Sequence, residues 1–130
     1  MNLNIQNVSL SIKGRPIVND VSITVNPGEV VGLMGPNGAG KTTTFNLVVG
    51  NIKPEKGYVL MNDKNITNLS LPTRSRLGLG YLTQEASIFR DLTVKENIDL
   101  ALQNSSFSSA AIRNRREQLI NEFNLNKFVD

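Results

Sequence analysis

The stretch GPNGAGKTTT, residues 35–44, constrains the fold more than any other part of the chain. Its glycines at the first and sixth places, followed by Lys41 and Thr42, form the Gly-x-x-x-x-Gly-Lys-Thr pattern of a phosphate-binding loop. Gly38 and Gly40 allow the backbone to approach phosphate oxygens without a Cβ in the way. In such a loop the lysine reaches the β- and γ-phosphates, and the threonine hydroxyl binds Mg²⁺. We therefore predict that this stretch holds phosphates.

The residues on either side of the loop fit a strand, a loop and a helix in that order. Residues 30–34 are apolar without alternation, which is typical of a strand covered on both faces in a parallel sheet. After the loop, apolar residues up to Gly50 predict a short helix that begins near Lys41. The N-terminus of that helix directs free N–H groups and a partial positive charge at a bound anion. Kinases, GTPases and transport ATPases share this unit, so the loop alone leaves the class of enzyme open.

The rest of the chain predicts strands in its first two thirds and helices in its last third. The predicted strands cover residues 3–12, 21–25, 58–61 and 80–83. A single helical turn is predicted over residues 72–77. From Thr93 onward the apolar residues fall at helical spacing, which predicts one helix there and a second over residues 108–123. The polar loop 104–108 separates the two helices, and Ser108 is placed to cap the second.

Composition excludes several kinds of protein. The formal net charge of +3 is mild, and the positive charges are scattered apart from Arg113, Arg115 and Arg116. We therefore predict no nucleic-acid partner. The absence of cysteine excludes a disulfide framework and a thiolate metal site. The N-terminus lacks the apolar core of a signal peptide, and no apolar run approaches the ~20 residues of a membrane span, so we expect any role at a membrane to depend on a partner protein.

The loop and the run YLTQEASIF at residues 81–89 together resemble the nucleotide-binding subunit of ABC transporters. The aromatic-Leu-Pro-Gln loop of that family is nearly met by Tyr81, Leu82, Thr83 and Gln84, and this pairing is hard to match with a kinase or a GTPase. Within the family, the chain looks most like the ATP-binding subunits of lipopolysaccharide export, and the ATPases of branched-chain amino acid uptake are similar. The resemblance covers essentially the whole chain but only the first half of a whole subunit, so we expect the chain to stop before the family's signature motif.

The resemblance implies an α/β fold, the N-terminal portion of a P-loop ABC ATPase. Residues 1–85 are expected to form the ATP-binding core, with an antiparallel β subdomain and the strand-loop-helix unit. Residues 86–130 are expected to begin the α-helical subdomain.

The resemblance also implies ATP and Mg²⁺ as ligands. Thr42 and Gln84 would complete the Mg²⁺ shell, and Gln84 would sense the γ-phosphate. Of the family's catalytic residues, the chain then carries Lys41 and Gln84. The residues implied to bind ATP are Gly35, Pro36, Asn37, Gly38, Ala39, Gly40, Lys41, Thr42 and Thr43, with Ile12 beside the base.

Two positions depart from the family pattern. Ile12 stands where an aromatic ring usually stacks on adenine, so we predict weaker and less base-selective binding. Thr83 stands where proline is usual, and it keeps a backbone N–H that proline lacks, which predicts a less stiff loop.

The resemblance implies partners as well. Residues 84–90 would form the contact with a membrane-spanning transporter subunit, the part after Gln84 facing its coupling helix, and Phe89 and Arg90 are candidate contacts. The full-length subunit would form a head-to-tail homodimer, peripheral on the cytoplasmic face of a bacterial inner membrane.

Hydrolysis needs more than a phosphate loop. Asp63 reads better as part of a turn than as the carboxylate that holds Mg²⁺, no segment reads as the LSGGQ signature, and the chain has no histidine. We therefore predict that this chain alone binds ATP without turning it over. Three alternatives stay open: a non-hydrolytic nucleotide-binding fragment or decoy subunit, the ATPase of a branched-chain amino acid importer, and a small P-loop kinase or GTPase. The lack of an Asn-Lys-x-Asp motif disfavours the last.

Overall fold

The computed structural model describes residues 1–85, 87–103 and 108–128. The chain divides into two compact units, residues 1–80 and residues 81–130. Ala86 and most of the predicted polar loop, residues 104–107, lie outside the described part of the chain.

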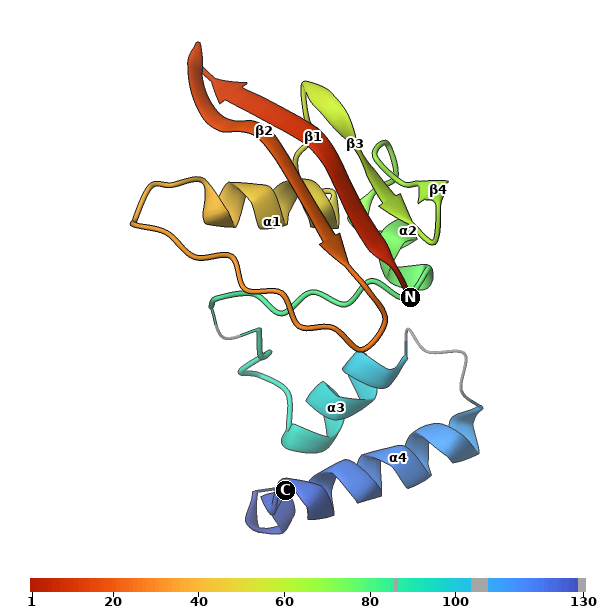
Figure 1. Ribbon diagram of the computed structural model, residues 1–130. Helices are drawn as coiled ribbons and strands as arrows, with labels where there is room; N and C mark the ends of the chain where they lie inside the picture. Colours follow the sequence, from red (N-terminus) through yellow and green to blue (C-terminus); the bar gives the residue numbers. More distant parts are fainter. Residues whose placement is uncertain (86, 104–107, 129–130) are drawn as a thin grey trace. The chain divides into compact units, whose positions relative to one another are not determined.

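The first unit is built on an antiparallel sheet of four strands in the order β2-β1-β3-β4 (Figure 1). The strands are β1 (Leu3–Ile12), β2 (Arg15–Val25), β3 (Lys56–Met61) and β4 (Lys64–Asn65). The strand predicted over residues 3–12 is confirmed. Those predicted over residues 21–25 and 58–61 are also present, and both begin earlier than predicted.

The β1–β2 hairpin explains why β2 begins earlier than its alternating pattern suggested. Ile12 pairs with Arg15, so Lys13 and Gly14 alone form the turn and the chain re-enters the sheet at once. Val18 then faces the core and is only 4% exposed. The expected break in the strand is therefore a two-residue turn, the shortest that joins antiparallel strands.

The helix α1 (Lys41–Val49) lies across one face of this sheet (Figure 1). Its Leu47 is fully buried, as are Val8 of β1 and Val59 of β3. Burial of a side chain of this size stabilises the fold by roughly 1.5–3 kcal/mol, so these contacts fix α1, and the loop before it, on the sheet. The core consists of Ile5, Val8, Leu10, Val18, Leu47, Val48, Val59, Met61 and Ile66.

The short helix α2 (Leu71–Arg76) confirms the helical turn predicted over residues 72–77. It carries a buried cation, because Arg74 is 1% exposed. The guanidinium of Arg74 donates hydrogen bonds to four carbonyl oxygens, and its burial lowers the pKa of Arg74. The acceptors are those of Leu47, Val48, Thr67 and Leu69. This side chain therefore joins α2 to the C-terminal end of α1.

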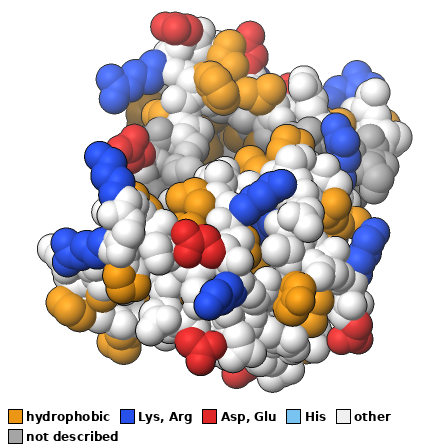
Figure 2. Space-filling view, turned by 90° about the horizontal axis from the view of Figure 1, so that it is seen from above, with side chains coloured by type: hydrophobic (Ala, Val, Ile, Leu, Met, Phe, Trp, Pro, Cys, Tyr) orange, Lys and Arg blue, Asp and Glu red, His pale blue; other side chains and the backbone are white. Residues whose placement is uncertain are grey.

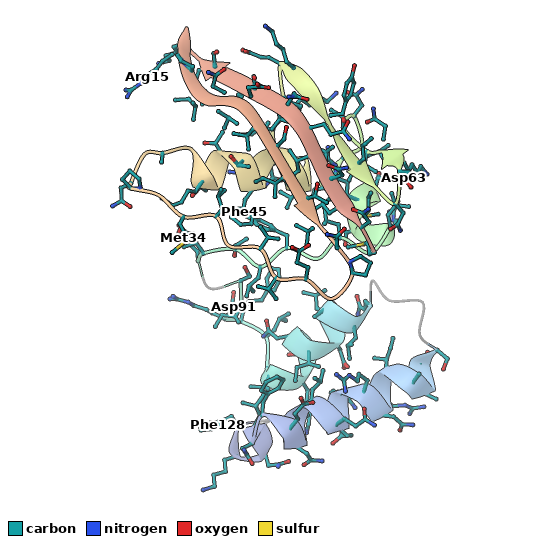
Figure 3. All side chains as sticks on the ribbon, in the orientation of Figure 1. Arg15, Met34, Phe45, Asp63, Asp91 and Phe128 are labelled. Carbon is teal, nitrogen blue, oxygen red and sulfur yellow. The ribbon has the colours of Figure 1, made fainter. Side chains whose placement is uncertain are left out.

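Two predicted strands are not formed, those over residues 30–34 and residues 80–83. Val31 and Leu33 line an apolar hollow of about 80 Å³ beside α1, whereas Met34 is 91% exposed (Figure 3). The first segment is thus covered in part and is not buried on both faces. A strand needs a hydrogen-bonded neighbour, and none of the four strands in the described residues pairs with either segment.

The second unit confirms the two helices predicted in the last third of the chain. Its elements are α3 (Val94–Leu102), α4 (Ser109–Glu122) and the 3₁₀ turn η1 (Leu125–Lys127). Thr93 caps α3 in a capping box with Glu96, and Ser108 caps α4 as predicted. Arg116 of α4 forms an ion pair with Asp99 of α3, with 2.6 Å between Nη1 and Oδ2.

Charge and hydropathy give two further results. No helix within the described residues is both long enough and apolar enough to cross a membrane. In the view of Figure 2, basic and acidic side chains are interspersed. The absence of a nucleic-acid partner stays a prediction.

Candidate functional site

The predicted phosphate-binding loop, residues 35–40, leads directly into α1, and Gly40 is the N-cap residue that precedes the first helical residue, Lys41. Gly40 has a φ of 87°, and a Cβ added to it would lie 2.4 Å from the carbonyl oxygen of Ile17 in β2. Only glycine fits an approach this close. The last residue of the loop is therefore seated on the sheet, while residues 35–39 are exposed.

The beginning of α1 is electropositive. No side chain in the described part of the chain caps Gly40, and the first turn contains no acidic residue. The N–H groups of a first turn have no partner within the helix, and the helix dipole adds a partial positive charge there. The carbonyl oxygen of Gly40 accepts from the backbone N–H and the hydroxyl of Thr44 at 2.8 and 3.0 Å. An anion is the natural ligand of such a helix start.

The ammonium group of Lys41 reaches back to the start of the loop. Its Nζ donates to the carbonyl oxygens of Gly35 and Pro36, each at 2.7 Å. An ammonium group has three donors. Two of them close the loop around the lysine, and the third is available to a phosphate oxygen.

The other predicted phosphate contacts lie beside this lysine. The backbone N–H of Ala39 donates to the carbonyl oxygen of Pro36 at 3.2 Å, which makes a turn between Pro36 and Ala39. In the first turn of α1, Thr42 is exposed and Thr43 is half-buried. Thr42 offers an oxygen ligand of the kind that Mg²⁺ prefers. Residues 35–43 therefore lie together as one continuous segment at the start of α1, and their contact with phosphates stays a prediction.

Ile12, predicted to lie beside the base, is the last residue of β1 and is 48% exposed. Its partner across the hairpin is Arg15. Two residues further along β2 is Ile17, on which Gly40 of the loop is seated. Ile12 thus presents an aliphatic side chain to solvent at the end of the hairpin, and its contact with a base stays a prediction.

Gln84 lies in the second unit, whereas residues 35–43 lie in the first, so a shared Mg²⁺ shell stays a prediction. Gln84 is exposed. Beside it, the hydroxyl of Thr83 donates to the carbonyl oxygen of Glu85 at 2.7 Å and is hydrogen bonded to the hydroxyl of Ser87. The Thr83 side chain is therefore hydrogen bonded within its own loop. The sequence-based prediction, which considered only the backbone N–H that threonine has and proline lacks, did not include these contacts.

The segment after Gln84 carries exposed apolar side chains, and Ile88 and Phe89 are 65% and 59% exposed. The backbone of Phe89 is held by Asn97, in the first turn of α3. Sequence reasoning missed Asn97. The one signal that could have found it is its place directly after a Thr-x-x-Glu capping box.

Asp63 lies in the β3–β4 turn with a φ of 63°, as the turn prediction required. Figure 3 shows it at the opposite end of the first unit from the start of α1. Over the described residues, no group of three His, Cys, Asp or Glu side chains could hold a metal ion.

Comparison with known proteins gives one family. The ABC transporter family matches residues 18–130. The lipopolysaccharide export system ATP-binding protein LptB of Escherichia coli (strain K12) is 48% identical over 129 residues, which are 98% of this chain and 54% of that protein. The protein of the same name from Haemophilus influenzae is 45% identical over 129 residues, with the same coverage of 98% and 54%. The chain spans about half the length of the curated relatives it matches.

Solved structures show the same likeness. The ATP-binding subunit of an ABC transporter superposes with a TM-score of 0.85 at 28% identity, over 99% of this chain and 53% of that one. An ATP-binding cassette of an ABC transporter in its ADP conformation superposes with a TM-score of 0.80 at 25% identity, over 100% of this chain and 57% of that one. The predicted α/β fold of the N-terminal part of an ABC ATPase is confirmed.

Proposed function

The chain belongs to the ABC transporter family, and we propose that it forms the ATP-binding part of a subunit that couples ATP to the export of lipopolysaccharide. One observation carries the ATP-binding proposal: the ammonium of Lys41 is held by the carbonyl oxygens of Gly35 and Pro36 at the start of a helix that no side chain in the described residues caps. These groups fit a polyphosphate, since they offer an ammonium donor, free N–H groups and no carboxylate.

Each loop residue has a role in this proposal. The backbone of residues 35–40 surrounds the phosphates, and Lys41 donates to the β- and γ-phosphate oxygens. Thr42 and Thr43 follow at the helix start. Thr42 and Gln84 would hold Mg²⁺, which screens the phosphate charge when bound. Ile12 would cover the base by apolar contact alone.

We propose that the two ends of the chain have separate tasks. Residues 1–85 act as the ATP-binding core, and residues 86–130 begin a helical subdomain. The segment 84–90 contacts a membrane-spanning subunit, which its exposed apolar side chains at Ile88 and Phe89 support. The full-length protein is then a homodimer on the cytoplasmic face of a bacterial inner membrane.

Hydrolysis is proposed for the full-length protein and not for these residues alone. The chain contains no histidine, and Asp63, the one carboxylate considered for Mg²⁺, lies in the β3–β4 turn. Lys41 and Gln84 are the family's catalytic residues that remain. We expect this chain to bind ATP without measurable turnover.

Export of lipopolysaccharide is favoured over amino acid import by the relatives, since proteins 43% to 48% identical carry the export name. The test is equilibrium binding of the chain to two sets of membrane-spanning subunits in lipid nanodiscs. One set comes from the lipopolysaccharide export system of Escherichia coli, and the other from a branched-chain amino acid importer. Preference for the first supports the proposal, and equal or reversed preference contradicts it.

A further inference from the structure

One side chain, that of Asn97, holds the segment that leads into α3. Its Oδ1 accepts from the backbone N–H of Phe89 at 2.9 Å, and its Nδ2 donates to the carbonyl oxygen of Phe89 at 3.0 Å. The same Nδ2 lies 3.1 Å from the carbonyl oxygen of Leu92 and 3.0 Å from that of Thr93. A single amide therefore bonds both backbone groups of Phe89, as a neighbouring strand would.

The helix cap does not require Asn97. The hydroxyl of Thr93 accepts from the backbone N–H of Glu96 at 3.3 Å, and the Glu96 carboxylate accepts from the backbone N–H and hydroxyl of Thr93 at 2.8 and 2.9 Å. That capping box is complete without a third side chain. Asn97 reaches past the cap to Phe89 and Leu92, which precede the helix. Its bonds therefore fix the segment before α3.

The segment that is fixed in this way presents an apolar side chain to solvent. Phe89 is 59% exposed, although its backbone is held by Asn97 and its carbonyl oxygen also accepts from the N–H of Leu92 at 3.2 Å. Ordering an exposed ring gains little in the isolated chain. An anchor that is already fixed loses less conformational freedom when a partner covers it, and aromatic anchors dominate the energetics of many interfaces.

We propose that Asn97 is a positioning residue that pre-organises residues 89–93 so that Phe89 meets the membrane-spanning partner in its binding geometry. This inference rests on the proposed function, which places that partner on residues 84–90. Asn97 acts through Phe89 and is not itself the anchor.

The substitution Asn97→Asp tests the hydrogen bonds of the Asn97 side chain with almost no change in its shape. It keeps the acceptor for the Phe89 N–H but turns a carboxylate oxygen toward the carbonyl oxygens that Nδ2 now contacts, which repels them. Asn114→Asp, on the exposed side of α4, is the matched control because it adds the same charge elsewhere in the unit. Asn97→Gln, which moves the amide by one methylene group, is the second variant if the first does not fold.

The measurement is the affinity of each variant for the membrane-spanning subunits of the Escherichia coli lipopolysaccharide export system in nanodiscs, combined in a double-mutant cycle with Phe89→Ala. We expect Asn97→Asp and Phe89→Ala each to weaken binding by about tenfold or more. The double variant should have about the same affinity as whichever single variant binds less tightly. Non-additivity of this kind is what a residue acting through Phe89 produces.

Two other results have separate meanings. If the unmodified chain binds and Asn97→Asp binds equally well, the hydrogen bonds of Asn97 are only a structural feature and the inference is overturned. The inference is also overturned if the loss of binding affinity caused by Asn97→Asp adds in full to the loss caused by Phe89→Ala. If the unmodified chain does not bind, the proposed partner is wrong and the inference fails with it.

Discussion

Arg74 Nη1 lies 2.9 Å from the carbonyl oxygen of Leu47, in the last turn of the helix that begins with Lys41. The last carbonyl groups of a helix have no partner within it, and a cation at that end also complements the helix dipole. The helix whose start is the proposed phosphate site is therefore closed at its other end by a buried guanidinium. This contact ties α2 to α1 across 27 residues of sequence.

Replacing this arginine should destabilise the first unit. Arg74→Met keeps much of the volume but leaves four carbonyl oxygens without their donor, and three of these hydrogen bonds are buried. Each orphaned acceptor costs about 1–3 kcal/mol, and after relaxation we expect the free energy of unfolding to fall by roughly 3 kcal/mol. Urea unfolding measures the loss, and Arg76→Met on the exposed side of the same helix is the control. Equal stability of the two variants would show that the hydrogen bonds of Arg74 contribute little to the free energy of unfolding.

Gly40→Ala should damage the loop more than Gly38→Ala. Both residues have a φ above 80°, so both substitutions carry backbone strain of about 1 kcal/mol. Only at Gly40 does the new Cβ collide with the carbonyl oxygen of Ile17, whereas at Gly38 it meets nothing within 4 Å. Thermal unfolding should show the larger decrease in Tm for Gly40→Ala. An equal decrease in Tm for both would mean that the backbone at Ile17 of β2 moves readily to make room for the Cβ.

Ile12→Tyr should strengthen the binding of ATP. A ring at this exposed position can stack on adenine, and a stacked base gains about 1–3 kcal/mol in comparable sites. The control is inorganic triphosphate, which has no base and should bind the parent and the variant alike. An unchanged affinity for ATP would remove Ile12 from the proposed site.

The carboxyl group of Glu96 should titrate below its usual range. The backbone N–H and then the hydroxyl of Thr93 donate to it, which lowers the pKa of Glu96. A depressed pKa in the folded state means that the stabilising effect is present above the unfolded pKa and is lost as pH falls through the folded pKa. Carbon NMR of the carboxyl group measures this directly. Thr93→Ala should raise the pKa of Glu96 only part of the way toward its usual value, since the larger cause, the backbone N–H of residue 93, remains. An ordinary pKa of Glu96 in the parent would contradict the capping box.

The sequence was sufficient where chemistry depends on neighbours along the chain. The glycines and Lys41 predicted the loop, and Ser108 predicted the start of α4, because these contacts span only a few residues. The sequence was insufficient where a residue's hydrogen-bonding partner lies far away along the chain. Nothing in the sequence near Arg74 indicates that its acceptors lie at the end of α1. The strand predicted over residues 30–34 is not formed because its apolar pattern cannot supply the neighbouring strand that it needs.

The measurement that tests the account most directly is calorimetric titration of the purified chain with MgATP, for the parent and for Lys41→Ala, with Lys53→Ala as the control at an exposed lysine. Lys41 contributes charge-assisted hydrogen bonds, each worth about 1.5–3 kcal/mol. We predict saturable binding by the parent and by Lys53→Ala, and an affinity at least about tenfold lower for Lys41→Ala with its circular dichroism unchanged. A folded Lys41→Ala variant that binds MgATP as tightly as the parent would contradict the assignment of residues 35–43 as the phosphate site.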